Sequence, residues 1–291
     1  MIRFRAAACA VVLACSQPAW GARLRSFDLP GFAVCGAAIA DDGTVAGNVL
    51  GHGPTLSFLY QDGVFTLLPL LDAQGPTTGR TTVTGINRAH VLAGANTVFG
   101  RDFSAHSSGF LIYGASSRAV RVDVQLPGAI SSTVTAIAND GAIAGSFQTT
   151  ANAATLGYVR HGDKMTILND GSAMLTPSAI DPTGTRLVGT SLNGGIVSWS
   201  YQAGKFAPVR MPGALVTFAN GINRAGNISG TYLAGSSGAP TRHGFIMAAG
   251  KYTSIDIPQA SATILTGINA HGTVTGCYTN LHGTHGLIYT P

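Results

Sequence analysis

A tandem repeat of about 45 residues constrains this chain more than any other feature. The clearest copy is residues 266–276, TGINAHGTVTG, followed by residues 285–289, HGLIY. Its central isoleucine recurs at spacings of 47, 51, 43, 42 and 46 residues, at Ile39, Ile86, Ile137, Ile180, Ile222 and Ile268. Roughly 40 to 50 residues is the period of a β-propeller blade. The repeat therefore predicts an all-β fold, a six-bladed β-propeller.

Each repeat reads as four short antiparallel strands bounded by turn residues. Apolar residues alternate with small or polar residues in segments such as 57–60 and 65–68, which is the period of a half-buried strand. Gly43 and its equivalents suit a hairpin turn that needs φ > 0. His90 replaces this glycine in the second repeat, so we expect strain or a changed turn there. Residues 181–189 hold one extra residue, which predicts a bulge.

The two ends of the chain complement each other. The sixth repeat stops at Pro291 after its third strand, whereas residues 26–31 match residues 254–258, the fourth strand of the fifth repeat. We therefore expect a strand near the N-terminus to complete the last blade, which leaves no open edge between the first and last blades. Residues 23–291 then form one domain.

The N-terminal 22 residues have the pattern of a secretory signal peptide. Residues 1–5 are cationic, residues 6–14 are apolar, and residues 18–22 offer small residues for cleavage. An alternative cleavage signal, residues 12–15, resembles a lipobox and would leave a lipid anchor at Cys15. Nine apolar residues are too few to span a bilayer, so we expect no transmembrane segment. Both cleavage signals predict a protein that is exported from the cytoplasm and is secreted, periplasmic or extracellular.

The two cysteines outside the leader region, Cys35 and Cys277, fall on the first and sixth repeats, which meet where the ring closes. An oxidising compartment permits a disulfide between them, and we expect one; two buried free thiols are the alternative. Two cysteines without a Cys-x-x-Cys motif do not support a structural zinc site.

The sequence pattern of the repeats resembles the bacterial extracellular repeats of the HAF family. The fifth repeat carries it best, in residues 221–223 (GIN), 230–232 (GTY), 243–245 (HGF) and 252–258 (YTSIDIP). The resemblance covers residues 24–291 and implies a secreted or envelope-associated repeat protein. It carries over no catalytic residues.

Two long connections are the candidate binding loops. Residues 72–83 and 95–108 are expected on the face opposite the hairpin turns, where loops on a rigid scaffold often bind ligands. Their side chains could stack on a sugar or peptide and hydrogen-bond to it; the alternative is a solvated loop. The candidate residues are Arg80, Phe99, Arg101, Asp102, Phe103 and His106. The Asn or Asp after the anchor isoleucine in four repeats is interpreted as a turn cap rather than a ligand.

Catalytic and cofactor motifs do not appear in the sequence. The chain has no glutamate, no Gly-x-Ser-x-Gly and no His-x-x-x-His, so we predict no catalytic residue, metal or cofactor. Its three lysines form no basic run, which argues against nucleic-acid binding. The leading hypothesis is a monomeric, non-catalytic binding or scaffold module whose partner is a glycan or an envelope protein. The alternative is a polysaccharide lyase or glycoside hydrolase acting at the channel mouth, which convergent titratable residues there would favour.

Overall fold

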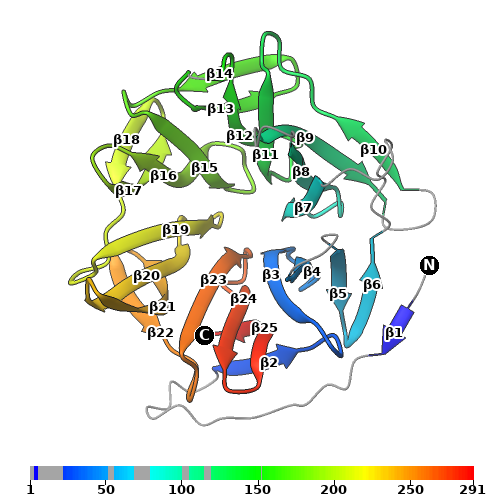
Figure 1. Cartoon of the computed structure of the whole chain (residues 1–291), viewed down its shortest axis with the longest axis vertical. Helices are drawn as coiled ribbons and strands as arrows, with labels where there is room; N and C mark the ends of the chain where they lie inside the picture. Colours follow the sequence, from blue (N-terminus) through cyan, green and yellow to red (C-terminus); the bar gives the residue numbers. More distant parts are fainter. Residues whose placement is uncertain are drawn as a thin grey trace.

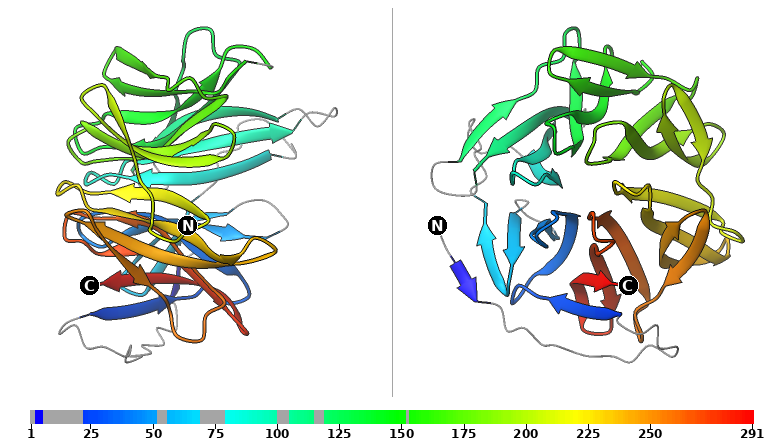
Figure 2. Two further views of the ribbon diagram at one scale, coloured as in Figure 1. Left: turned by 90° about the vertical axis from the view of Figure 1, so that its left-hand side faces the viewer. Right: turned by 180° about the vertical axis from the view of Figure 1, so that it is seen from behind.

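The strands are arranged radially around a central axis, as Figures 1 and 2 show. This computed structural model describes residues 3–5, 22–51, 56–68, 79–99, 105–114, 119–151 and 153–291. The described residues form 25 β-strands, and they include no helix long and apolar enough to cross a membrane. The predicted all-β propeller class is confirmed. The predicted signal peptide, including Cys15 and its lipobox, lies outside the described residues apart from residues 3–5 and 22.

Four of the sheets are single blades. The first contains β3 (Ala33–Ile39), β4 (Val45–Leu50), β5 (Ser57–Gln61), β6 (Val64–Leu67) and, outermost, β1 (Arg3–Arg5). The second contains β7 (Gly79–Ile86), β8 (Leu92–Phe99), β9 (Ala105–Tyr113) and β10 (Val120–Asp123). The third contains β11 (Ser131–Ile137), β12 (Ile143–Gln148), β13 (Leu156–His161) and β14 (Lys164–Leu168). The fourth contains β15 (Met174–Ile180), β16 (Arg186–Leu192), β17 (Ile196–Gln202) and β18 (Lys205–Pro208).

The last two repeats share one eight-stranded sheet, so the prediction of six separate blades is wrong in this respect. The fifth repeat supplies β19 (Val216–Ile222), β20 (Ile228–Ser236), β21 (Ala239–Ala248) and β22 (Lys251–Ile255). The sixth supplies β23 (Ala262–Ile268), β24 (Val274–Asn280) and β25 (Gly283–Thr290), to which β2 (Arg23–Phe27) is added. A single parallel bridge between Arg242 and Ala262 joins the two sets. The equivalent bridge between the third and fourth repeats, from Thr155 to Met174, does not merge two sheets because Thr155 lies just before β13, whereas Arg242 lies within the ten-residue β21.

The chain closes on itself through β2, as expected. This strand pairs antiparallel with β25, from Arg23 opposite Thr290 to Phe27 opposite Gly286, and the two strands lie side by side in Figure 1. A Cβ atom at residue 286 would collide with the Phe27 ring, so glycine is needed at this position. The N-terminal strand therefore takes the place of the missing fourth strand of the sixth repeat.

The predicted disulfide between Cys35 and Cys277 is confirmed. It links β3 to β24, with the two Cα atoms 4.8 Å apart and 242 residues of separation along the chain. Two side-chain hydrogen bonds cross the same seam, from Thr266 Oγ1 to the Gly36 carbonyl (2.8 Å) and from Asn269 Nδ2 to the Ala40 carbonyl (3.2 Å). Covalent and hydrogen bonds thus join the first and last repeats.

Two of the turn predictions have different outcomes. His90 has φ of 56°, the left-handed conformation that Gly43 adopts at 86°, so the expected strain is present. The predicted bulge in residues 181–189 is wrong. The extra residue widens the turn instead, because Asp181 Oδ1 accepts the N–H groups of Thr185 (2.8 Å) and Arg186 (2.9 Å). Bulge-like register shifts occur instead in the first strand of the repeats, as between Gly36 and Ala38 in β3.

Candidate functional site

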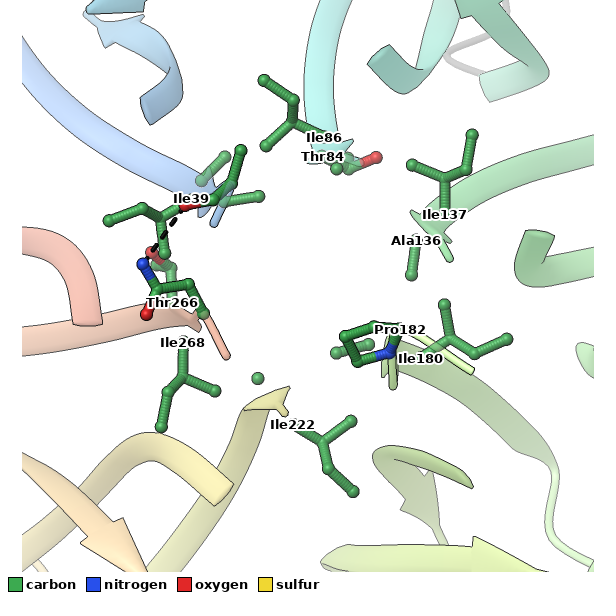
Figure 3. Close-up of a pocket in the computed structure, with 18 of the residues that line it drawn as sticks. Ile39, Thr84, Ile86, Ala136, Ile137, Ile180, Pro182, Ile222, Thr266 and Ile268 are labelled. Atoms are coloured by element: carbon green, nitrogen blue, oxygen red, sulfur yellow. Dashed lines mark hydrogen bonds between the residues drawn. The ribbon is translucent and has the colours of Figure 1, made fainter. Parts of the chain in front are cut away.

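The central channel is narrow, and its wall offers little chemistry. Its cavity is about 80 Å³, which holds a few water molecules, whereas ligand pockets usually measure roughly 300–1,000 Å³. Figure 3 shows the six anchor isoleucines around this channel with their side chains turned away from its axis. They are buried between the blades. Small side chains such as Thr84, Ala136 and Thr266 form much of the inner wall, and Asp41, Arg88 and Asn139 line it where it opens.

The channel opens at the face that carries the turns between first and second strands, which we call the turn face. A hollow of about 580 Å³ there is lined by Asp41, Arg88, Asn139, Pro182 and Arg224, together with neighbouring turn residues. Four described groups with shifted pKa values lie outside both the channel and this hollow: Asp42, Tyr60, Tyr158 and Asp170. No three His, Cys or Asp side chains come together as a metal site among the described residues.

Asp42 lies beside the hollow and links the first two blades. Its carboxylate is 2.8 Å from His90 Nε2 and accepts the Thr44 N–H at 2.9 Å. Burial raises the pKa of Asp42, but the hydrogen bonds from Thr44 and the nearby His90 ring outweigh this and hold the pKa below its ordinary value. The carboxylate that His90 contacts therefore stays ionised, as a structural partner of the strained turn rather than as a proton donor.

The Asn residues after the anchor isoleucines cap the turns, as predicted, and they also join neighbouring repeats. Asn269 Oδ1 accepts the N–H groups of His271 and Thr273, both at 3.0 Å. Its Nδ2 donates to the Ala40 carbonyl of the first repeat. Asn87 and Asn223 cap their turns in the same way. The Nδ2 of Asn87 donates to the Ala138 carbonyl, and that of Asn223 donates to the Asn269 carbonyl. The sequence indicated the cap, but the link between repeats depends on the three-dimensional ring.

Asn269→Asp is expected to lower the free energy of unfolding by about 1–3 kcal/mol, the usual loss when a buried hydrogen-bonding group is left unpaired. The carboxylate can still accept both turn N–H groups but has no hydrogen to donate to the Ala40 carbonyl, and residue 269 is only 5% exposed. Urea unfolding measures the difference, with Asn193→Asp in an exposed turn as the control. Equal stability of wild type and Asn269→Asp would show that the link between repeats contributes nothing.

The predicted binding residues that the structure describes, Arg80, Phe99 and His106, do not lie on one side of the sheet. Arg101, Asp102 and Phe103 lie outside the described residues. Residues 79–83, 95–99 and 105–108 are strand rather than open loop, because they continue the cross-strand pairing of β7, β8 and β9. Arg80 pairs with Thr97, and Val98 pairs with His106. Since side chains alternate along a strand, Arg80 and Phe99 point to one side of the sheet and the exposed His106 points to the other.

Two histidines at the same position of the fifth and sixth repeats lie in matching clusters. His243 Nδ1 is 2.6 Å from Asp256 Oδ1, and His285 Nδ1 is 2.6 Å from Asp28 Oδ1. Each ring stacks on a tyrosine at a centroid distance of 5.1 Å, His243 on Tyr232 and His285 on Tyr278. These contacts tie the third strand of a repeat to the segment after its fourth strand.

In the fifth-repeat cluster, a hydroxyl, an imidazole and a carboxylate lie in a row, as a nucleophile, its base and an orienting acid do in some enzymes. Thr241 Oγ1 is 2.7 Å from His243 Nε2, on the opposite side of the ring from Asp256. In the sixth repeat, His285 Nε2 instead contacts Asn280 Oδ1 at 3.1 Å, and an amide oxygen cannot act as a nucleophile. The part that recurs is therefore Tyr, His and Asp, which serves to join strands.

Large apolar side chains gather on the face opposite the turn face, which we call the linker face. It carries the connections between blades and the turns between second and third strands. Of fourteen exposed large apolar residues in the described part of the chain, ten lie at this face. They are Phe32, Leu50, Phe99, Ile130, Met174, Leu192, Ile196, Val197, Leu215 and Leu281. The exposure of a side chain cannot be predicted from sequence alone. The recurring Pro-Gly-Ala-apolar pattern of residues 127–130 and 212–215 could have indicated an apolar residue at this face.

Part of the linker face is concave. A groove between β17 and β19 is lined by Ile196, Val197, Arg210 and Leu215, among other residues. Ile196 is 46% exposed and Leu215 is 49% exposed. The groove offers apolar surface and one cation, which suits contact with a partner better than chemical catalysis.

The fold is similar to solved propeller structures, whereas no protein-family model and no curated protein matches the chain. A structure from Agrobacterium tumefaciens assigned as TolB has a TM-score of 0.53 at 12% identity, covering 89% of this chain and 91% of that one. AofleA from Arthrobotrys oligospora has a TM-score of 0.51 at 13% identity, covering 92% of this chain and 85% of that one. At such identities the similarity shows the fold alone.

Proposed function

We propose that this protein is an exported, non-catalytic binding module that engages an envelope protein through its linker face. The observation that carries the proposal is the concentration of exposed apolar side chains on that face. Contiguous exposed apolar surface on a soluble protein usually marks an interaction site. We count the double sheet as two blades, which makes the scaffold a six-bladed ring with one broad face for a partner.

Export is supported by the disulfide and by the leader pattern. Cys35 and Cys277 are bonded, and disulfides persist mainly in oxidising compartments outside the cytoplasm. The leader pattern of residues 1–22 and the HAF-like wording of the repeats agree with an extracellular or periplasmic location. Membership of that family is part of the proposal.

The channel gives no support to the enzyme alternative. Titratable residues with shifted pKa values at the mouth would have favoured a lyase or hydrolase. Tyr60, Tyr158 and Asp170 do not line the hollow at that mouth, and Asp42, which lies beside it, is engaged by Thr44 and His90. The wall of small residues and backbone suits a scaffold instead. A protein partner is also a better match than a glycan for the aliphatic linker face, because aliphatic side chains are buried readily by another protein.

Ile130→Asp combined with Leu215→Asp is expected to weaken binding to a purified envelope fraction at least tenfold. Both residues follow a Pro-Gly-Ala turn on the linker face and are 45% and 49% exposed. A charge at each position would have to be desolvated on binding. Co-sedimentation of the protein with the envelope fraction, before and after protease treatment of that fraction, measures the affinity and identifies protein as the receptor.

The control is Val122→Asp with Ile167→Asp, which places the same charges on the outer strands β10 and β14 at positions 47% and 52% exposed. It should bind as wild type does. Equal weakening by both double variants would argue against the linker face. Binding that survives protease treatment and is competed by glycans would replace the protein partner with a carbohydrate.

A further inference from the structure

The outer edge of the first blade has a fifth strand paired to it. β1 runs antiparallel to β6, with Arg3 opposite Thr66, residue 4 opposite Phe65, and Arg5 opposite Val64. Figures 1 and 2 show β1 at the periphery of the ring, outside β6. The main chain of β6 is therefore accessible to an extended segment that approaches from outside.

β6 differs from the other outer strands in its charge. Its sequence, VFTL, contains no charged residue and no proline. Each of the other described outer strands carries at least one charge: RLRSF in β2, VRVD in β10, KMTIL in β14, KFAP in β18 and KYTSI in β22. Charges, lysine above all, and proline are the usual means by which proteins prevent a free strand edge from pairing with another chain. β6 lacks this protection.

The unprotected edge is also held firmly in place. Phe65 is fully buried, and its ring lies 5.0 Å from the rings of both Phe58 and Tyr60. It also contacts the Phe27 ring at 6.0 Å. The backbone of β6 is thus fixed before any partner arrives, which reduces the entropy lost on pairing.

We propose that the outer edge of β6 is a docking site for an extended strand of a different protein, with basic and apolar residues like those of β1, which pairs antiparallel with Val64–Leu67 through main-chain hydrogen bonds. Strand addition to a sheet edge is a general mode of peptide recognition. The structure supplies an example of the occupant, because a short extended segment of this same chain is seated there. Residues 3–5 belong to the predicted leader, and its removal opens the edge. This proposal concerns the rim of the ring and does not depend on the linker face.

The test compares the full chain with the chain that begins at Arg23, which keeps every strand from β2 to β25. The probe is a fluorescent peptide of residues 1–8, MIRFRAAA. Fluorescence anisotropy should show saturable binding to the shorter form and at least tenfold weaker binding to the full chain, whose own strand competes. Hydrogen exchange should show new protection in β6 on binding and none in β10 or β14.

Thr66→Lys in the shorter form is expected to weaken peptide binding at least tenfold, because it gives β6 the edge charge that the other outer strands carry. Thr166→Lys, at the matching position of β14, is the control and should bind within twofold of the unsubstituted shorter form. The probe is basic, so Thr66→Glu is measured as well; a charge of either sign should hinder pairing, whereas simple repulsion would weaken only the lysine variant. Saturable binding without protection of β6, no binding to the shorter form, or a dimer that already protects β6 would overturn the proposal.

Discussion

Removing the Cys35–Cys277 disulfide is expected to lower the free energy of unfolding by about 5 kcal/mol, the largest effect of any change at the seam. The bond closes a loop of 242 residues, nearly the whole domain. In the chain-entropy model, cross-linking so long a loop strongly reduces the freedom of the unfolded chain. The folded ring should change little, because the β2–β25 pairing and the Asn269–Ala40 hydrogen bond remain.

Two forms of the protein without the disulfide distinguish the effect of losing the cross-link from the effect of losing side-chain packing. The reduced wild type keeps both sulfur atoms and loses only the cross-link, whereas Cys35→Ala with Cys277→Ala also loses packing at residue 277, which is 2% exposed. Urea unfolding of both should show a similar large loss of stability, somewhat greater for the alanine variant. If the reduced and oxidised wild types unfold at the same urea concentration, the disulfide does not stabilise the fold by closing the loop.

The fold was largely predictable from sequence because its determinants are local and repeated. Gly43 and its equivalents, the anchor isoleucines and the match between residues 26–31 and 254–258 specify the turns, the inner strands and the closing strand. The double sheet was not predictable, because it depends on how far β21 extends as a strand and so includes Arg242, which bridges to Ala262. A single inter-strand bridge leaves no sequence pattern.

The candidate site was harder to predict, for physical reasons that particular residues illustrate. Residues 95–108 were assigned to a loop as one of the two long connections, yet Thr97 and Ser107 pair across β8 and β9 and share a hydrogen bond of 2.8 Å. Phe99 lies at an exposed position of the linker face. The rest of that face was missed, since exposure of Leu192 or Leu215 depends on how neighbouring blades pack rather than on local pattern.

Phe27→Ala is expected to lower the free energy of unfolding by about 3–5 kcal/mol, the usual loss for truncating a buried phenylalanine. Phe27 is 2% exposed, stacks on Tyr60 at 4.5 Å and meets the Phe58 ring at 6.0 Å. It therefore connects β2, which completes the sixth repeat, to the first blade. Phe99→Ala, at a position 44% exposed, is the control and should change stability by less than about 0.5 kcal/mol.

Combining Phe27→Ala with removal of the disulfide tests whether the two contacts act on one event, the opening of the ring between β25 and β3. With the disulfide intact, release of β2 leaves the first and last repeats tethered through Cys35 and Cys277. Without the disulfide, the same release lets the repeats separate, so the combined loss of stability should exceed the sum of the single losses by about 0.5–3 kcal/mol. Hydrogen exchange should then show β25 and β3 opening together. Strict additivity would mean that β2 and the disulfide stabilise the ring independently.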